Sequence, residues 1–148
     1  MPKESSSFQS FQDRLLEKFI IQTKIDREKI ACLLQNSFKL TGVIESVLID
    51  LKSGMILGSM SDENKNMLLI SASNNEITRK TILMIESIDK KKNLKNITFT
   101  CSDNILIIYH LSVTKSRDFF LYLVADAQKT NLALIHSQLE SIDMNIEL

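Results

Sequence analysis

Residues 42–54 read GVIESVLIDLKSG, an apolar run that closes in a tight turn. Residues 43–51 are rich in β-branched side chains and almost continuously apolar, which is typical of a strand covered on both faces. Gly54 can adopt the positive φ that a tight turn requires, so we expect residues 55–60 to return as a shorter strand. The stretch therefore predicts a hairpin whose first strand lies at the centre of a sheet.

A second central strand is predicted near the C-terminus, where residues 119–125 read FFLYLVA. Residues 96–102 and 105–111 form another predicted hairpin around the turn Asp103-Asn104. Residues 96–102 alternate apolar with polar side chains, which suits a sheet edge. Because the first and the fifth strands are apolar on both faces, we expect them to be neighbours, in the strand order 2-1-5-4-3.

Apolar residues at helical spacing predict four helices around this sheet. An amphipathic helix over residues 8–22 follows a polar tail, residues 1–7, that we expect to be disordered. A second helix starts after the N-cap Asp26 and ends before Gly42. A long helix spans roughly residues 66–89, and the closing helix carries its buried stripe on residues 132–142. The fold class is therefore α+β.

At 148 residues with 44% hydrophobic side chains, the chain has the size of one globular domain. Eighteen basic and eighteen acidic residues balance, so no net field favours nucleic acid or an acidic membrane as a partner. The start carries no secretory pattern, and no stretch approaches the roughly 18 apolar residues of a spanning helix. We expect a soluble, cytoplasmic protein without membrane contact.

Potential catalytic groups do not converge in the predicted fold. With Asp103-Asn104 as the turn, Cys101 and His110 are about 13 Å apart along the strand, beyond the reach of a Cys-His pair. His136 lies beside the apolar stripe of the last helix and is interpreted as a boundary residue. Cys32 and Cys101 are interpreted as inert, buried free thiols.

No spacing of His, Cys or acidic residues indicates a metal site, and no glycine-rich loop indicates a nucleotide site. Three glycines in the whole chain also leave few positions for a phosphate-binding loop. We therefore expect no catalytic residues, no cofactor and no metal.

From about Asp26 to Ile142 the chain resembles the Roadblock family. The resemblance is carried by the hairpin that ends at residues 50–54, the single long helix, residues 96–99, and residues 118–124 leading into residues 131–134. It implies a profilin-like five-stranded sheet between the long helix and the terminal helices, and a homodimer or a heterodimer within the family. On this basis residues 23–148 are the Roadblock-type domain, and residues 8–22 are an addition to the minimal pattern.

Family members include dynein light chains, scaffold subunits that carry small GTPases, and bacterial regulators of Ras-like GTPases. The helix that closes this chain is more similar to the bacterial regulators than to the short dynein chains. What the resemblance implies is a dimer that binds the switch region of a GTPase and biases its conformation, without a catalytic residue of its own.

The long helix carries two apolar arcs, and one of them exceeds what the core of a single domain needs. Surplus apolar surface of this kind is typical of an interface, although a helix buried on all sides would show the same pattern. Ile70, Ile77 and Met84 are spaced seven apart and are the predicted seam of a dimer. Thr98 and Thr100 on the edge strand are predicted to join it.

Charged residues surround the predicted seam. Glu76, Arg79, Lys80 and Glu86 lie on the same helix and are candidate contacts for a partner protein, although a solvated helix face is the commoner explanation of such charges. The sequence leaves open which arc of the helix faces the sheet.

The leading functional hypothesis is a dimeric, non-catalytic regulator of a Ras-like small GTPase. One alternative is an assembly adaptor that does not regulate a GTPase. Another is a small-ligand sensor of the profilin, PAS or GAF-like kind, which needs a pocket between sheet and helix. A single uninterrupted helix argues against the sensor. The apolar stripe of the predicted N-terminal helix, Phe8, Phe11, Leu15 and Phe19, is expected either to pack within the dimer or to bind a partner protein.

Overall fold

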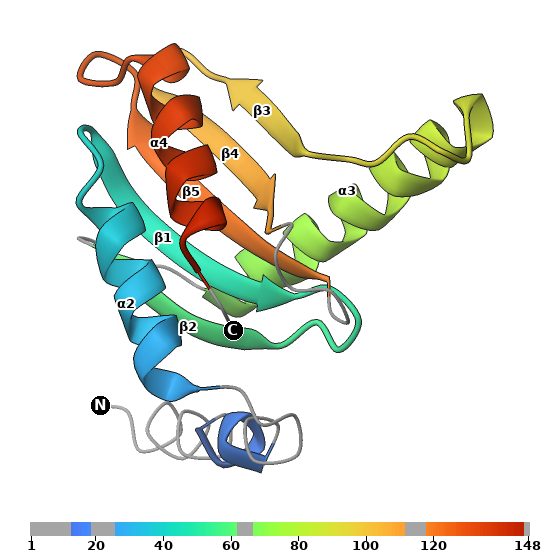
Figure 1. Cartoon of the computed structure of the whole chain (residues 1–148), viewed down its shortest axis with the longest axis horizontal. Helices are drawn as coiled ribbons and strands as arrows, with labels where there is room; N and C mark the ends of the chain where they lie inside the picture. The colour runs from blue at the N-terminus through green and yellow to red at the C-terminus, as the bar shows by residue number, and fades with distance from the viewer. Residues whose placement is uncertain (1–12, 19–25, 62–66, 112–117, 147–148) are drawn as a thin grey trace.

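The computed structural model describes residues 13–18, 26–61, 67–111 and 118–146. The described part of the chain forms one antiparallel sheet with helices on both of its faces (Figure 1). The strands are β1 (Val43–Asp50), β2 (Ile56–Ser61), β3 (Asn96–Thr100), β4 (Asn104–His110) and β5 (Phe119–Asp126). The helices are α2 (Arg27–Phe38), α3 (Met67–Ile88) and α4 (Leu132–Met144), and residues 13–18 are also helical.

The strand order is β2-β1-β5-β4-β3, as predicted. The two central strands pair over almost their whole length, with Val47 opposite Tyr122 and Leu48 opposite Leu121. Both strands are buried on both faces, because helices cover the sheet from either side. The nearly continuous apolar runs that predicted central strands are therefore a direct consequence of this layering.

The β1–β2 hairpin closes through the turn that the sequence predicts. Gly54 adopts a φ of 74°, and its N–H donates to the Asp50 carbonyl oxygen at 2.8 Å. The Asp50 carboxylate, which is buried, accepts hydrogen bonds from the Ser53 N–H at 3.1 Å and the Ser53 hydroxyl at 2.6 Å. These bonds hold the closed end of the hairpin in one conformation.

The β3–β4 hairpin differs from the prediction by two residues in register. The Cys101 N–H donates to the Asn104 carbonyl, so Ser102 and Asp103 form the turn and Asn104 already begins β4. At the other end of the hairpin, the His110 N–H donates to the Lys95 carbonyl. The predicted turn at Asp103-Asn104 was wrong, because the sequence offers several adjacent polar residues that suit a turn.

The first core lies between the sheet and the helices α2 and α4. Ile30, Leu33 and Leu34 of α2 and Ile135 and Leu139 of α4 are buried against one face of the sheet. Both helices begin where a polar side chain caps them: Asp26 accepts from the Glu28 N–H, as predicted, and Asn131 accepts from the Leu134 N–H.

α3 covers the opposite face of the sheet, where a second core is formed. Val47, Ile49, Ile108, Phe120 and Tyr122 are among its buried members. Figure 1 shows that α3 crosses beneath the sheet and that its C-terminal half projects beyond it. Among the described residues, none of the helices has the length and hydropathy that crossing a bilayer requires.

Residues 13–18 are the described part of the predicted N-terminal helix. Leu16 packs on the first core, Leu15 is 37% exposed, and Glu17 forms an exposed ion pair with Arg27 at 3.1 Å. The tail at residues 1–7 and the aromatic residues Phe8, Phe11 and Phe19 lie outside the described residues.

Candidate dimer and partner-binding surface

The arc of α3 that faces the sheet is largely polar. Ser71, Asn74 and Thr78 are buried there, while Ile70 and Ile82 pack on the second core from the same helix. Ser71, Asn74, Thr78 and Ile82 follow one another at intervals of three or four residues, so they share one side of the helix, and Ile70 adjoins Ser71 at the border of this arc. The sheet-facing arc therefore uses only a part of the helix's apolar residues.

Several apolar side chains of α3 outside this arc are exposed in the monomer. Ile77 is 38%, Met84 57% and Ile88 68% exposed. With Thr81 they are separated by four, three and four residues, the spacing of a helix-packing seam. The Thr81 hydroxyl donates to the Ile77 carbonyl at 2.7 Å, so its polar group is satisfied within the helix. We call Ile77, Thr81, Met84 and Ile88 the α3 seam.

Leu83 is exposed at 66% but does not belong to the α3 seam. It precedes Met84 by one residue and therefore points about 100° around the helix from it. Two adjacent side chains of similar size and exposure thus lie on different sides of the same helix. Matched substitutions of Leu83 and Met84 can therefore distinguish an effect that is specific to the α3 seam from a general effect of exposed apolar surface.

The outer edge of β3 offers unpaired backbone groups. Residues of an antiparallel strand direct their N–H and C=O groups alternately to the two edges. The Cys101 N–H donates to the Asn104 carbonyl and the Lys95 carbonyl accepts from the His110 N–H, so the backbone groups of these odd-numbered residues point toward β4. The groups of Asn96, Thr98 and Thr100 consequently face outward, and within the described residues no strand pairs with them.

The sheet next to this edge is also partly open on the α3 side. Ile97 and Phe99 of β3 and Leu106 of β4 belong to the second core but are only half-buried. β3 carries no charged residue and no proline, the features by which natural sheets block an open edge. The edge, the half-buried sheet residues and the α3 seam together form the candidate interface.

The predicted seam residues differ in burial along α3. Ile77 and Met84 lie on the exposed seam, whereas Ile70 is half-buried and packs on the second core of its own domain. On β3, Thr98 is half-buried and Thr100 is exposed. Thr81 and Ile88 extend the seam beyond the residues named from the sequence, and their 4-3-4 spacing from Ile77 is visible in the sequence.

The predicted partner-binding charges have different surroundings. Lys80 and Glu76 form an ion pair at 3.1 Å on the exposed surface of α3, one helical turn apart. The Arg79 guanidinium instead donates to the carbonyl oxygens of Leu51 and Lys52 in the β1–β2 hairpin. Glu86 is exposed near the projecting end of the helix. Arg79 thus has a structural contact that no sequence signal indicated.

The groups considered for catalysis do not come together. Cys101 and His110 lie at opposite ends of the β3–β4 hairpin. The His110 ring stacks on Phe120 with 4.7 Å between ring centroids, and its Nε2 is 3.6 Å from a carboxylate oxygen of Asp118. In the described residues no group of three His, Cys, Asp or Glu side chains is placed to hold a metal ion.

Both cysteines are exposed, contrary to the predicted burial. Cys32 lies on the outer side of α2, where it accepts a hydrogen bond from the Asn36 amide at 3.5 Å, and Cys101 follows the exposed end of β3. The apolar neighbours that suggested burial belong to the other side of the helix and to the adjacent strand.

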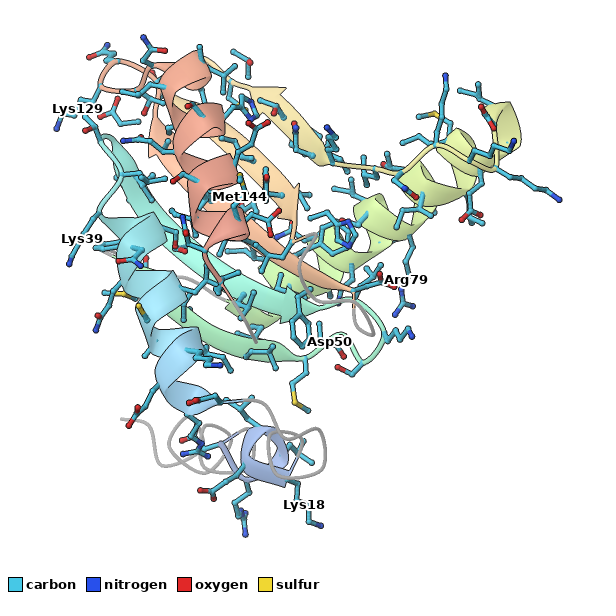
Figure 2. The ribbon with its side chains drawn as sticks, viewed as in Figure 1. Lys18, Lys39, Asp50, Arg79, Lys129 and Met144 are labelled. Carbon is cyan, nitrogen blue, oxygen red and sulfur yellow. The ribbon has the colours of Figure 1, made fainter. Side chains whose placement is uncertain are left out.

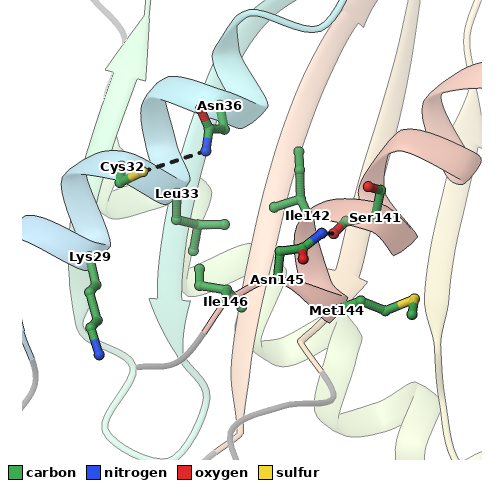
Figure 3. A pocket seen from close by; sticks show the side chains of 9 residues that line it. All are labelled: Lys29, Cys32, Leu33, Asn36, Ser141, Ile142, Met144, Asn145 and Ile146. Carbon is green, nitrogen blue, oxygen red and sulfur yellow. Dashed lines mark hydrogen bonds between the residues drawn. The ribbon is translucent and has the colours of Figure 1, made fainter.

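Two hollows flank α2. The first, of about 580 Å³, lies between α2 and α4 and is lined by Cys32, Leu33, Ile142 and Met144 among others (Figure 3). The second, of about 620 Å³, lies between α2, β2 and residues 13–17. A ligand sensor of the predicted kind needs a pocket between the sheet and the long helix, and neither of these hollows is there.

The two tyrosines lie in different cores and have raised pKa values. Burial, the Asp143 and Glu140 carboxylates and a hydrogen bond to Asp143 raise the pKa of Tyr109 to about 12. Burial and the nearby Glu45 carboxylate raise the pKa of Tyr122 to about 12. Tyr109 belongs to the core beneath α2 and α4, and Tyr122 to the core beneath α3.

Comparison with known proteins finds similarity in structure and not in sequence. No family model and no curated protein matches the chain. Myxococcus xanthus MglB matches with a TM-score of 0.70 at 14% identity, over 80% of this chain and 85% of that one. The gliding protein MglB from Thermus thermophilus matches with a TM-score of 0.66 at 14% identity, over 78% and 84%.

A third solved structure carries the family description itself. The Roadblock/LC7 domain from Streptomyces avermitilis matches with a TM-score of 0.61 at 9% identity, over 77% of this chain and 88% of that domain. These similarities agree with the observed strand order and with the helices on the two faces of the sheet. The chain has the fold of the Roadblock family.

Proposed function

We propose that the chain is a homodimeric, non-catalytic regulator that binds a Ras-like small GTPase and modulates its nucleotide state. The observation that carries the proposal is the candidate interface: an exposed apolar seam on α3 beside an open, uncharged sheet edge. Exposed apolar surface next to an unpaired strand is unfavourable in a monomer and is removed by pairing with a second copy.

In the proposed dimer the two β3 strands pair edge to edge through Asn96, Thr98 and Thr100, and the two α3 seams pack across the same two-fold axis. A two-fold interface is self-complementary, so the same residues serve both protomers. Ile70 supports the helix from its own sheet rather than joining the seam. The outer surface of the paired helices then presents Lys80, Glu76 and Leu83 to a partner.

Regulation without catalytic residues requires only different affinities for two conformations of the GTPase. The Roadblock fold supports this proposal because the family resemblance implies regulators of Ras-like GTPases. We propose no cofactor, and a cytoplasmic location follows from the class of partner.

The proposal is tested by capture of GTPases from native lysate, in the presence of GDP or of a non-hydrolysable GTP analogue. The baits are the tagged wild-type protein and the Ile77→Asp variant, in which a carboxylate stands in the seam. We expect a Ras-like GTPase on the wild-type bait in one nucleotide state and a reduced amount on the variant. Absence of any small GTPase in both states would contradict the proposal.

Hydrolysis and nucleotide exchange of the captured GTPase are then measured with and without the dimer. A change in either rate supports regulation. Binding that leaves both rates unchanged would make the protein an assembly adaptor.

A further inference from the structure

We propose that Arg79 is a positioning residue, which clamps α3 to the β1–β2 hairpin and thereby sets the direction in which the α3 seam leaves the sheet. The effect on dimerisation rests on the proposed function, whereas the clamp itself concerns the monomer. One nitrogen of the guanidinium, Nη2, is 2.6 Å from the Leu51 carbonyl oxygen and 3.3 Å from that of Lys52. Figure 2 shows Arg79 where α3 passes the closed end of the hairpin.

The hairpin is a firm anchor for this contact. The Leu51 N–H donates to the Asp118 carbonyl at 2.9 Å, so the residue whose carbonyl binds Arg79 is also tied to the segment before β5. The bonds of Asp50 to Ser53 and Gly54 hold the adjoining turn. Carbonyl groups in such a turn have no strand partner, and the cationic donor satisfies them with a strong, charge-assisted hydrogen bond.

Among the described residues, the other hydrogen bond from α3 to the β1–β2 hairpin is longer. The Ser71 hydroxyl is 3.4 Å from the Gly54 carbonyl oxygen, and the sheet-facing residues between Ser71 and Arg79 include the polar Asn74 and Thr78. Ile82 is the last residue of α3 in contact with the second core, one turn beyond Arg79. Met84 and Ile88 then project into solvent.

Because Arg79 lies well before the end of α3, a small change of helix direction at Arg79 moves the far end of the α3 seam by a larger distance. Nine residues separate Arg79 from Ile88, a distance of about 13 Å along the helix. A tilt of roughly 10° at Arg79 therefore displaces Ile88 by about 2 Å, enough to disturb the packing of side chains against a second copy. A contact that touches neither the seam nor the sheet edge can in this way control the interface.

Lys80 provides a matched control on the next position of the helix. It is exposed and cationic like Arg79, but its ion pair is with Glu76 on the same helix. Removing Lys80 changes the surface charge by the same amount and releases no contact with another element. Arg79→Ala thus removes the contact with the hairpin, whereas Lys80→Ala removes only an exposed ion pair within α3.

The test measures amide hydrogen exchange along α3, the dissociation constant of the dimer and the melting temperature for both variants and for Arg79→Lys. For Arg79→Ala we expect faster exchange in residues 80–88 and a dimer dissociation constant raised roughly tenfold, as loss of a hydrogen bond from a charged group would give. Arg79→Lys is expected to be intermediate, because an ammonium group lacks the planar fork of the guanidinium. In these three measurements, none of which involves the partner, Lys80→Ala should match the wild type.

Three results would overturn the inference. In the first, Arg79→Ala and Lys80→Ala exchange at the same rate in residues 80–88. In the second, exchange and dimerisation of Arg79→Ala are unchanged while capture of the GTPase is lost, which would make Arg79 a partner contact. The third applies if Arg79→Ala fails to fold: Arg79→Lys would then exchange in residues 80–88 at the same rate as the wild type. A wild-type protein that is monomeric at every concentration would refute the proposed dimer. The clamp would then still be tested by the exchange rates of residues 80–88 in the monomer.

Discussion

The two tyrosines of the chain sit on opposite faces of the sheet and therefore report on the two cores separately. Tyr109 also connects two layers, because its hydroxyl is hydrogen-bonded to Asp143 near the end of α4. On the other face Tyr122 lies beside the buried Glu45 of the neighbouring strand. In both places a neutral phenol is favoured over a phenolate, since burial and a carboxylate both oppose a second negative charge.

Alkaline pH should consequently destabilise the protein in a defined range. Tyrosine ionises at about pH 10 in the unfolded chain, and the fold raises both pKa values to about 12. A raised pKa favours the protonated state, so this contribution to stability is complete below pH 10 and is lost as the pH rises from about 10 to about 12. The absorbance of tyrosinate, recorded against pH, should rise near pH 10 in denaturant and near pH 12 in the native protein. Native ionisation near pH 10 would contradict the assigned environments.

Burial of single residues was predictable where a periodicity could be followed and unpredictable at element ends. Cys32 is two positions from both Ile30 and Leu34, so the helical period alone places it on the side opposite the core. The apolar composition of the segment obscured this. Cys101 follows directly on β3, and its exposure depends on a turn whose position the sequence left ambiguous.

At the scale of elements, α3 departs most from a simple amphipathic helix. Its sheet-facing arc contains Ser71, Asn74 and Thr78, so hydropathy alone could not indicate which side packs on the domain. The two-face pattern correctly indicated surplus apolar surface. Ile70 is seven residues before Ile77 and therefore lies on nearly the same side of the helix, but it packs on the second core whereas Ile77 is exposed.

Replacing Asn74 with leucine should stabilise the protein. The Asn74 side chain is buried, and within the described residues its Nδ2 has no hydrogen-bond partner. A buried unsatisfied donor costs about 1–3 kcal/mol, and leucine has a similar volume. We expect Asn74→Leu to raise the free energy of unfolding by about 1 kcal/mol, measured in urea, while the solvent-exposed control Ser73→Leu leaves it nearly unchanged. A destabilised Asn74→Leu would show that the amide has a polar partner that the leucine removes.

The N-terminal helix should contribute modestly to stability. Leu16 packs on the first core, but Leu15 is 37% exposed and the Glu17–Arg27 ion pair is exposed. An exposed ion pair adds little, so among the described residues of this helix the gain comes mainly from Leu16, at roughly 1.5–3 kcal/mol before the cost of ordering the chain. Deleting residues 1–22 should therefore lower the melting temperature in a thermal scan and increase the binding of a hydrophobic dye. Unchanged melting with lost GTPase capture would assign the helix to the partner site.

At the scale of the whole molecule, the sheet order and the placement of the helices were predictable because burial leaves a strong pattern. Strands covered on both faces have no polar side, and this property identified β1 and β5 as the central pair. The candidate interface was predictable only in outline. Its two parts, the seam and the β3 edge, belong to different elements, and the relative placement of two elements leaves no periodic signal in the sequence.

The central claim is that two copies pair through the α3 seam, and the molar mass in solution tests it most directly. Light scattering is recorded at micromolar concentration for the wild type, Met84→Asp and Leu83→Asp, whose substitutions are adjacent, equally charged and both exposed. An unpaired carboxylate inside a dry interface costs several kcal/mol, whereas one on the open surface costs little. The wild type and Leu83→Asp should have twice the mass of the 16.9 kDa chain, and Met84→Asp should be a folded monomer. A monomeric wild type, or a Met84→Asp variant that remains dimeric, would contradict the account.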